Sequence, residues 1–233
     1  MLIDPFLHIV GEPYFAASQF GDRFGEVRAA DDLVGLLPAD RPKSAAAISA
    51  KYATLIAFES EATSIKAFGP LIVPGLLQTE EYARALLQNG QPRLGPDEIE
   101  TRIEARKGRQ AIFDTDHPPR GQFIIDEAVL RRRVGGDVVM RAQLRHLAQV
   151  SARPDIGLQV IPFSAGAHAG TLGPLVILGF ADGEDVVYCE TYAGDLYPET
   201  VAWYSDVFDR LARDALSKTK SAELLKAAAE ELR

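Results

Sequence analysis

The segment "QFIIDEAVLRRRVGGDVVMRAQLRHLAQVSARPDIGLQVIPF" (residues 122–163) decides the fold that the sequence predicts. It begins with a short apolar run, "QFIID" (122–126), and ends with another, "GLQVIPF" (157–163), each the length of a buried strand. Between them, "DVVMRAQLRHLAQVSA" (137–152) repeats apolar residues at helical spacing, and Asp137 is a suitable N-cap. A strand, a helix and a second strand in this order predict a sheet with a helix packed on it.

The residues after this segment extend the sheet and close the chain with helices. Two further apolar runs, "PLVILGF" (174–180) and "DVVYCET" (185–191), predict strands, and "ADGED" between them is typical of a hairpin turn. Amphipathic patterns predict two final helices over 199–216 and 220–232.

The residues before this segment predict a helical portion. Apolar positions at helical spacing indicate one long helix from Ala45 to about Ala67, and two more helices are expected over 79–90 and 95–113. Thr79 is the expected N-cap of the second helix. The expected fold class is α/β (α+β), with a small mixed sheet of about four strands packed with helices and preceded by a helical portion.

The composition restricts the classes of function. Of 233 residues, 33 are acidic and 25 basic, and the net charge of −8 argues against nucleic acid as the main ligand. The single cysteine, Cys189, excludes an intramolecular disulfide. No apolar run approaches the roughly 20 residues of a membrane span, and the N-terminus lacks the pattern of a secretory signal, so the expected location is the cytoplasm.

Motifs for cofactors and metals are absent from the sequence. It contains no P-loop, no dinucleotide-binding glycine pattern after a strand and no HExxH. The four histidines lack the spacing of metal ligands. The sequence therefore predicts no cofactor and no metal.

A glycine-rich loop, "IPFSAGAHAGTLGP" (161–174), separates two predicted strands. Its three glycines permit backbone angles and close approaches that side chains would forbid. We expect the loop to connect neighbouring strands and to carry His168 as its one ionisable side chain. A structural or pocket-rim role for His168 is favoured over catalysis.

Six blocks of sequence carry a resemblance to a known family. In chain order they are "YATLIAFESEATSI", "IVPGLLQTEEYARALL", "RIEARKGRQAIF", "FIIDEAVLRRRVGG", "MRAQLRHLAQVSARPDIGLQVIPFSAGAHAG" and "VVYCET". Over about residues 48–232 the chain resembles the C-terminal part of actinobacterial XRE-type helix-turn-helix regulators. The resemblance implies an effector domain of poorly defined function, in proteins described as transcriptional regulators or as antitoxin-like partners of small neighbouring proteins.

Residues 1–48 depart from that family, because a DNA-binding helix-turn-helix would be expected there. The segment is irregular and rich in aromatic residues, glycine and proline, and its acidic residues outnumber its basic ones. Both properties are unsuited to reading DNA. We therefore divide the chain into residues 1–48, a candidate pocket lid, and residues 49–233, a regulator-type effector domain.

Two functions from different classes remain open. The first is a ligand- or partner-binding effector domain with an indirect regulatory role, whose partner is a small molecule or a small protein and neither nucleic acid nor a membrane. The amphipathic C-terminal helices suit a homodimer and a buried core equally. The alternative is a cofactor-independent enzyme of specialised metabolism, a cyclase or isomerase such as a pericyclase, that reuses the regulator's pocket.

Four residues with suitable side chains are candidates for catalysis: Asp126, His168, Tyr188 and Glu190. Glu190 alternates with Tyr188 and Tyr192 on one strand face, where a carboxylate between two phenols suits a general base or a contact to a polar ligand. The alternative is that Glu190 pairs with an arginine such as Arg106 or Arg109.

The candidate ligand-binding residues are aromatic or polar: Tyr14, Phe15, Phe20, His168, Tyr188, Glu190, Tyr192 and Trp203. Those near the N-terminus would line the pocket from the lid, since ligand sites are mostly apolar. Trp203 is expected in the core, with a pocket wall as the alternative.

Overall fold

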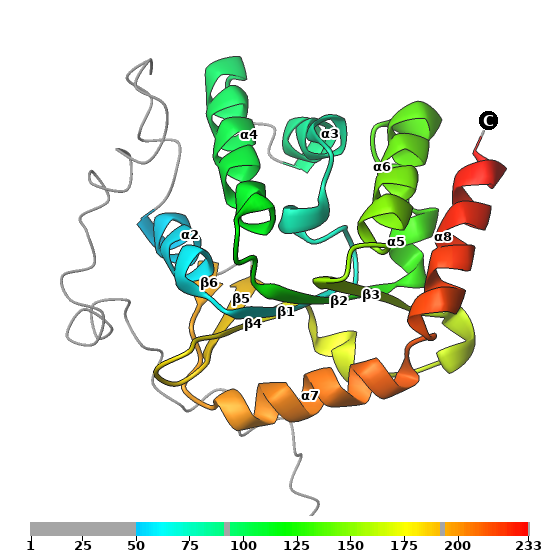
Figure 1. The fold of residues 1–233 in the computed structure, drawn as a ribbon. Helices are drawn as coiled ribbons and strands as arrows, with labels where there is room; N and C mark the ends of the chain where they lie inside the picture. Colours follow the sequence, from blue (N-terminus) through cyan, green and yellow to red (C-terminus); the bar gives the residue numbers. More distant parts are fainter. Residues whose placement is uncertain (1–49, 91–93, 192–193, 233) are drawn as a thin grey trace, which may run out of the picture.

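The computed structural model describes residues 50–90, 94–191 and 194–232 (Figure 1). At its centre lies a mixed sheet of six strands in the order β3-β2-β1-β4-β5-β6. In chain order the strands are β1 (Ser64–Gly69), β2 (Arg120–Asp126), β3 (Ile156–Ile161), β4 (Leu175–Gly179), β5 (Val186–Thr191) and β6 (Gly194–Leu196). β1, β2 and β3 are parallel, whereas β4, β5 and β6 each pair antiparallel with the strand before them in the sheet.

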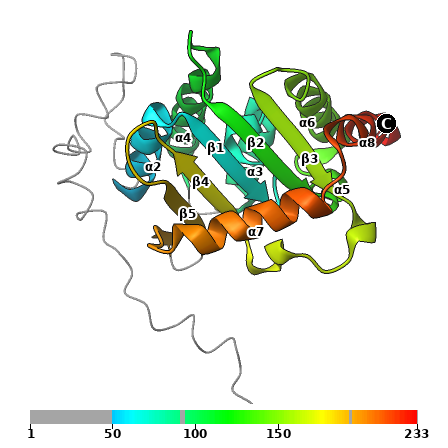
Figure 2. The ribbon, with the colours of Figure 1, turned by 60° about the horizontal axis from the view of Figure 1, so that its bottom comes forward.

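Helices cover both faces of the sheet unequally. One face carries α2 (Ala50–Glu61), α3 (Glu80–Gly90), α4 (Pro96–Gln110), α5 (Glu127–Arg131), α6 (Gly136–Val150) and α8 (Lys218–Glu231) (Figure 1). The other face carries α7 (Val201–Asp214), which runs across the strands (Figure 2). The connections from β1 to β2 and from β2 to β3 place their helices on the same face, because both step in the same direction along the sheet.

The core has two layers, one on each face of the sheet. Side chains alternate along β2, so that Phe123 and Ile125 pack against the six-helix face while Ile124 packs toward α7. On the α7 side, Phe208 and Leu211 are almost fully buried against the sheet. Because both faces of the sheet are covered, side chains on both sides of a strand can be apolar, as in β4.

The fold class predicted from the sequence is confirmed, but the sheet is larger than expected and one helix was wrongly extended. The predicted helix from Ala45 to Ala67 ends at Glu61 in the structure, and Ser64–Gly69 forms β1 instead. β1 pairs in parallel with β2 and antiparallel with β4, so it is a central strand. These pairings on both edges of β1 outweigh the helical pattern of a six-residue stretch. The three-residue strand β6 was also not predicted.

The other predicted elements agree with the structure within a few residues. Thr79 caps α3 as expected, because its side-chain oxygen accepts a hydrogen bond from the amide of Tyr82 at 3.3 Å. Asp137 does not cap α6: the N-cap is Gly135, which has a positive φ of 69°. Within the described ranges, no helix has the length and apolar character needed to cross a membrane.

The glycine-rich loop does not connect neighbouring strands, contrary to the prediction. It leaves β3 and enters β4, and β2 and β1 lie between these two strands in the sheet. The loop therefore passes the ends of β2 and β1 at the edge where the three parallel strands finish. We call this edge the carboxyl edge. Antiparallel β4 begins there, with Leu175 opposite Phe68 near the end of β1.

Candidate functional site

A buried ion pair joins α2 to α4. The Arg109 guanidinium donates two hydrogen bonds to the Glu59 carboxylate, from Nε to Oε2 at 2.6 Å and from Nη2 to Oε1 at 2.7 Å. Its Nη1 donates to the hydroxyl of Tyr52, and the guanidinium also lies 5.0 Å from the centre of the Tyr52 ring. The side chains of Arg109 and Glu59 are 8% and 2% exposed. Every nitrogen of this guanidinium therefore has a partner.

The charge of Arg109 is strongly favoured by these contacts. Burial by itself lowers the pKa of Arg109, but Glu59 and Tyr52 act in the opposite direction, and the net pKa lies above its ordinary value. Two parallel hydrogen bonds between guanidinium and carboxylate are among the strongest polar contacts in proteins. This pair holds α2 against α4.

Arg106 lies three residues earlier on α4 and has different surroundings. Its Nε and Nη1 are fully buried, and neither has a hydrogen-bond partner in the part of the chain that the structure describes. Burial lowers the pKa of Arg106 and the charge of Arg109 adds to this, whereas Tyr52 and Glu190 act to raise it. Because arginine stays protonated in proteins, Arg106 is a cation with two covered and unused donors.

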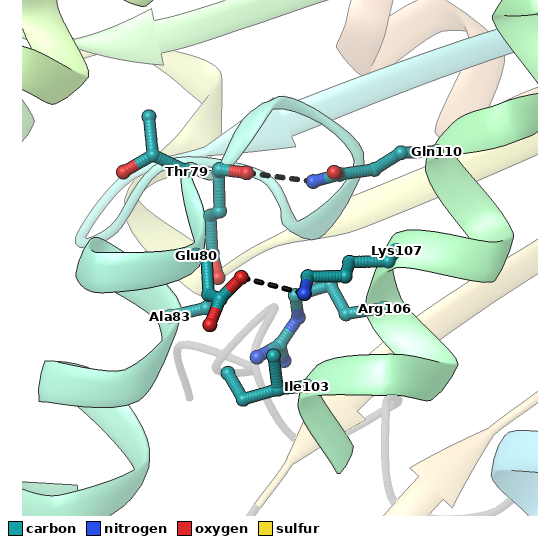
Figure 3. A pocket seen from close by; sticks show the side chains of 8 residues that line it. Thr79, Glu80, Ala83, Ile103, Arg106, Lys107 and Gln110 are labelled. Carbon is teal, nitrogen blue, oxygen red and sulfur yellow. Dashed lines mark hydrogen bonds and ion pairs between the residues drawn. The ribbon is translucent and has the colours of Figure 1, made fainter. Parts of the chain in front are cut away.

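Arg106 lines a narrow cleft between α3 and α4 (Figure 3). An ion pair between Lys107 and Glu80, with Nζ and Oε2 2.6 Å apart, crosses its mouth. At the other end, Gln110 donates from Nε2 to the main-chain oxygen of Gln78 at 2.7 Å. The cleft is small, with room for about one water molecule in a volume of about 10 Å³.

Gln78 is the second unusual residue of this cleft. It is 3% exposed and its Nε2 donates to the carbonyl of Val73 at 2.6 Å. Its Oε1 is buried and, among the described residues, accepts no hydrogen bond. Buried polar atoms are nearly always hydrogen bonded. Two residues that line the cleft, Arg106 and Gln78, thus have buried polar atoms without a partner among the described residues.

A second polar contact fastens the glycine-rich loop at the carboxyl edge. Asp126 ends β2 and caps α5, since its Oδ1 accepts from the amide of Ala128 at 2.7 Å. Its Oδ2 lies 3.1 Å from Nε2 of His168. The other ring nitrogen of His168, Nδ1, accepts from the amide of Gly170 at 3.2 Å. These partners assign the ring proton to Nε2, so both nitrogens are engaged within the loop.

The packing around His168 is equally close. The ring meets Phe68 edge to face, with ring centres 5.9 Å apart and an interplanar angle of 85°. A Cβ on Gly170 would lie 2.2 Å from the Phe68 ring, so this position accepts no larger residue without movement. The structure thus brings Asp126 and His168 together and gives both of them contacts within the fold.

The structure separates the predicted residues of β5. Tyr188 is 6% exposed and packs on Tyr197, with ring centres 5.5 Å apart. Glu190 is exposed on the face of β5 that Tyr188 shares, the face covered by α2 and α4. Of the two arginines considered for Glu190, Arg109 is bound to Glu59 instead, and Arg106 interacts electrostatically with Glu190.

The remaining predicted residues have two different outcomes. Trp203 is 45% exposed at the start of α7 and lies against Tyr204, so its expected place in the core is wrong. A helix pattern alone does not show that this first turn extends past the sheet. Tyr192 lies outside the described residues, as do Tyr14, Phe15 and Phe20 of the candidate lid.

Burial shifts the pKa values of two other titratable groups, Cys189 and His146. Burial raises the pKa of the Cys189 thiol to about 11, with Tyr204 acting against this, so the thiol is protonated at neutral pH. Burial also lowers the pKa of His146 on α6. In the described ranges, no three His, Cys, Asp or Glu side chains gather in a way that could hold a metal ion.

Sequence reasoning missed Gln78 and the pairing of Glu59 with Arg109. The signal for the pair was present, because Glu59 falls on the apolar stripe of a predicted helix, where a carboxylate requires a buried partner. Arg106 and Arg109 share a helix face with buried Ile103. The signal for Gln78 was absent, since a glutamine before a helix is ordinary.

Comparison with known proteins places the chain in a family. A family model described as "Domain of unknown function (DUF5753)" matches residues 52–227. The chain belongs to this family. No curated protein and no solved structure matched the chain. The α3–α4 cleft and the Asp126–His168 contact both lie within the DUF5753 match.

Proposed function

We propose that this DUF5753 chain is an effector domain that binds a small protein partner and takes part in transcriptional regulation indirectly. The resemblance to the C-terminal part of XRE-type regulators supports this function, as does the acidic net charge of −8, which is unsuited to DNA. The observation that carries the proposal is the apolar character of the carboxyl edge.

Large apolar side chains are exposed mainly at this edge. Six are exposed among the described residues: Leu71 (58%), Ile72 (40%), Val138 (68%), Phe163 (58%), Leu172 (62%) and Trp203 (45%). The first five lie in the loop after β1, at the start of α6, which follows β2 and α5, and in the loop after β3. Single exposed apolar residues are normal, but a concentration of them marks a binding surface.

The charges at this edge favour a partner that carries a carboxylate. Arg131 pairs with Glu231 at 2.5 Å, and Arg133 pairs with Asp137 at 2.9 Å. Arg132 donates only to the carbonyl of Leu71, at 3.2 Å, and contacts no carboxylate among the residues described. Its charge therefore stands uncompensated beside the exposed Leu71 side chain.

This arrangement favours a different protein over a second copy of the chain. In a two-fold symmetric dimer the same patch meets itself, so the uncompensated Arg132 of each copy would enter one apolar interface. A small protein with an apolar face and an acidic residue would instead complement both features. We therefore name a small, acidic, apolar-faced protein as the partner.

The contacts described above do not favour the cyclase. Both ring nitrogens of His168 are engaged within the loop, and Glu190 is exposed rather than enclosed with a substrate-sized cavity. Binding therefore remains the function that the geometry supports best.

A two-hybrid screen tests the proposal. The full chain is used as bait against a library of genomic fragments from the source organism, and each positive is retested with Ile72→Ser/Phe163→Ser and with Arg132→Glu. We expect positives that encode small proteins, loss of binding with both variants, and no loss with the control Trp203→Ser, which removes an exposed apolar residue on α7.

Two results would overturn the proposal. One is binding that the edge variants leave intact while their circular dichroism spectra match the wild type. The other is tight, saturable binding of the purified chain to promoter DNA. Light scattering of the purified chain tests the dimer, and a dimer that Arg132→Glu strengthens would identify a second copy as the occupant.

A further inference from the structure

We propose that protonation of His168 releases the turn that carries Leu172 at the carboxyl edge, and that acidification thereby weakens the binding of the protein partner. The inference rests on the proposed function, because it describes the regulation of that same apolar surface. It concerns the second half of the glycine-rich loop, which contains the short 3₁₀ turn η6 (Ala169–Leu172). His168 is the N-cap of this turn.

In its neutral form, the His168 ring joins the turn to the sheet through both of its nitrogens. Nε2 donates to Oδ2 of Asp126 at 3.1 Å, and Nδ1 accepts from the amide of Gly170 at 3.2 Å. The side chains of His168 and Asp126 are only 9% and 16% exposed, so little water reaches this pair. Each nitrogen therefore has one role, which the surrounding fold fixes.

Protonation would put these two contacts in conflict. The added proton would occupy Nδ1, because a histidinium ring has a donor at both nitrogens and no acceptor. The Gly170 amide would then point its own proton at another donor, so this contact must break. The contact of Nε2 to Asp126 would instead join two charged groups, which strengthens it. We therefore expect the ring to stay on Asp126 and the turn to move.

The packing of Gly170 determines the direction of that movement. A Cβ on Gly170 would lie 2.2 Å from the Phe68 ring, so there is no room for the turn to move toward the sheet. Gly166 and Gly173 flank the turn with positive φ values of 69° and 133°, and no described atom lies within 4 Å of where their Cβ atoms would be. These two glycines suit hinges. The turn should shift outward and take with it the exposed Leu172 side chain.

The charged groups around the ring come from several elements. Among the described residues, Asp126 of β2 is the one charged group that contacts the His168 ring. Glu127, at the start of α5, accepts from the amide of Phe163 instead, and Lys66 of β1 lies over an aromatic ring of α7. The charged side chains of α7 are exposed and form no ion pair with His168 in the part of the chain that the structure describes: Asp206, Asp209, Arg210, Arg213 and Asp214.

NMR spectra of the purified full chain test this inference without a partner. The pH is varied between about 7.5 and 5, a range that spans the ordinary titration of histidine near about 6.5. We expect the Gly170 amide signal and the Leu172 methyl signals to shift with the same midpoint as the His168 ring signals. The protection of the Gly170 amide against hydrogen exchange should fall about fivefold, because one hydrogen bond is lost.

Variants show whether His168 is the group responsible. His168→Asn keeps an acceptor for the Gly170 amide and cannot be protonated, so it should remove the pH dependence of the Gly170 and Leu172 signals. His117→Gln, at an exposed histidine before β2, is the matched control and should leave this pH dependence unchanged. Circular dichroism at both ends of the pH range checks that the variants are folded.

The partner from the two-hybrid screen, once purified, provides a second readout. It should bind the wild-type chain about fivefold more weakly at the acidic end of the range, and it should bind His168→Asn equally at both ends. Equal binding of the partner to the wild type at both ends overturns the regulatory role.

Two results in the spectra would overturn the release itself. One is a Gly170 amide signal that does not follow the titration of the His168 ring. The other is a pH response of the Leu172 signals that persists in His168→Asn. Because the spectra require no partner, failure of this proposal and failure of the partner proposal are distinguishable.

Discussion

Arg106 and Arg109 occupy the same helix face, three residues apart, yet the fold provides a carboxylate partner for only one of them among the described residues. Arg109 has Glu59 and Tyr52 as partners, whereas two nitrogens of Arg106 have none among the described residues. The difference arises because α2 supplies a single carboxylate at this depth. A buried arginine stabilises the fold where another element holds its partner, whereas buried donors without partners cost stability.

The largest expected effect comes from removing the partner of Arg109. Glu59→Gln leaves a buried guanidinium without its counter-charge, which should lower the free energy of unfolding by about 3–5 kcal/mol. Urea unfolding followed by circular dichroism measures this. Glu61→Gln, at an exposed position on the same helix, is the control and should change stability by less than about 0.5 kcal/mol. Equal effects for the two variants contradict the role of the pair.

The next effect has the opposite sign. Arg106→Met keeps the apolar stem and removes a buried charge with unused donors, so the protein should gain about 1–3 kcal/mol in the free energy of unfolding. Arg109→Met, the matched variant three residues along, should be destabilised. Thermal and urea unfolding measure both. Destabilisation by both variants to the same extent would mean that Arg106 is already satisfied.

The His168 contacts give a smaller effect and sharpen the comparison. His168→Ala removes the contacts to Asp126 and Gly170, which should cost about 1–2 kcal/mol. His168→Asn can still accept from the Gly170 amide, so we expect roughly half of that loss. Hydrogen exchange of the loop amides provides a local readout. An unchanged exchange rate in His168→Ala contradicts the fastening role.

The smallest effect concerns His146, whose side chain, unlike that of Arg106, can lose its charge near neutral pH. Burial lowers the pKa of His146, so the folded state binds fewer protons than the unfolded state near that pKa. Stability is therefore fully present above the unfolded pKa of about 6.5 and falls as the pH drops below it. Unfolding between pH 7.5 and 5 should show this fall, and His146→Gln should reduce its slope. An identical slope in both proteins excludes His146 as the source.

Much of the architecture could be predicted from periodicity. The strand–helix–strand unit of residues 122–163, the hairpin after it and the last two helices appear within a few residues of their expected places. The stretch Ser64–Gly69 could not be assigned in this way, because six residues fit both a helix end and a strand. Only its pairing with β2 and β4 decides between them.

The candidate site was predicted in part. Alternation correctly put Tyr188 and Glu190 on one face of β5, and this face is the one that α2 and α4 cover. The sequence offered Arg106 and Arg109 as equal partners for Glu190. It had no means to show that Glu59 would take Arg109, because that contact joins residues 50 positions apart.

The sequence by itself determined the residue types and their local periods: apolar strands, amphipathic helices, one acidic residue on an apolar helix stripe and a glycine-rich loop around His168. Local periods arise from the backbone geometry of each element, so they are readable one segment at a time. The tertiary structure alone decided that β1 is central, that the loop crosses two strand ends, and that one arginine is paired while its neighbour is not. Each of these depends on contacts between distant segments, which no single segment encodes.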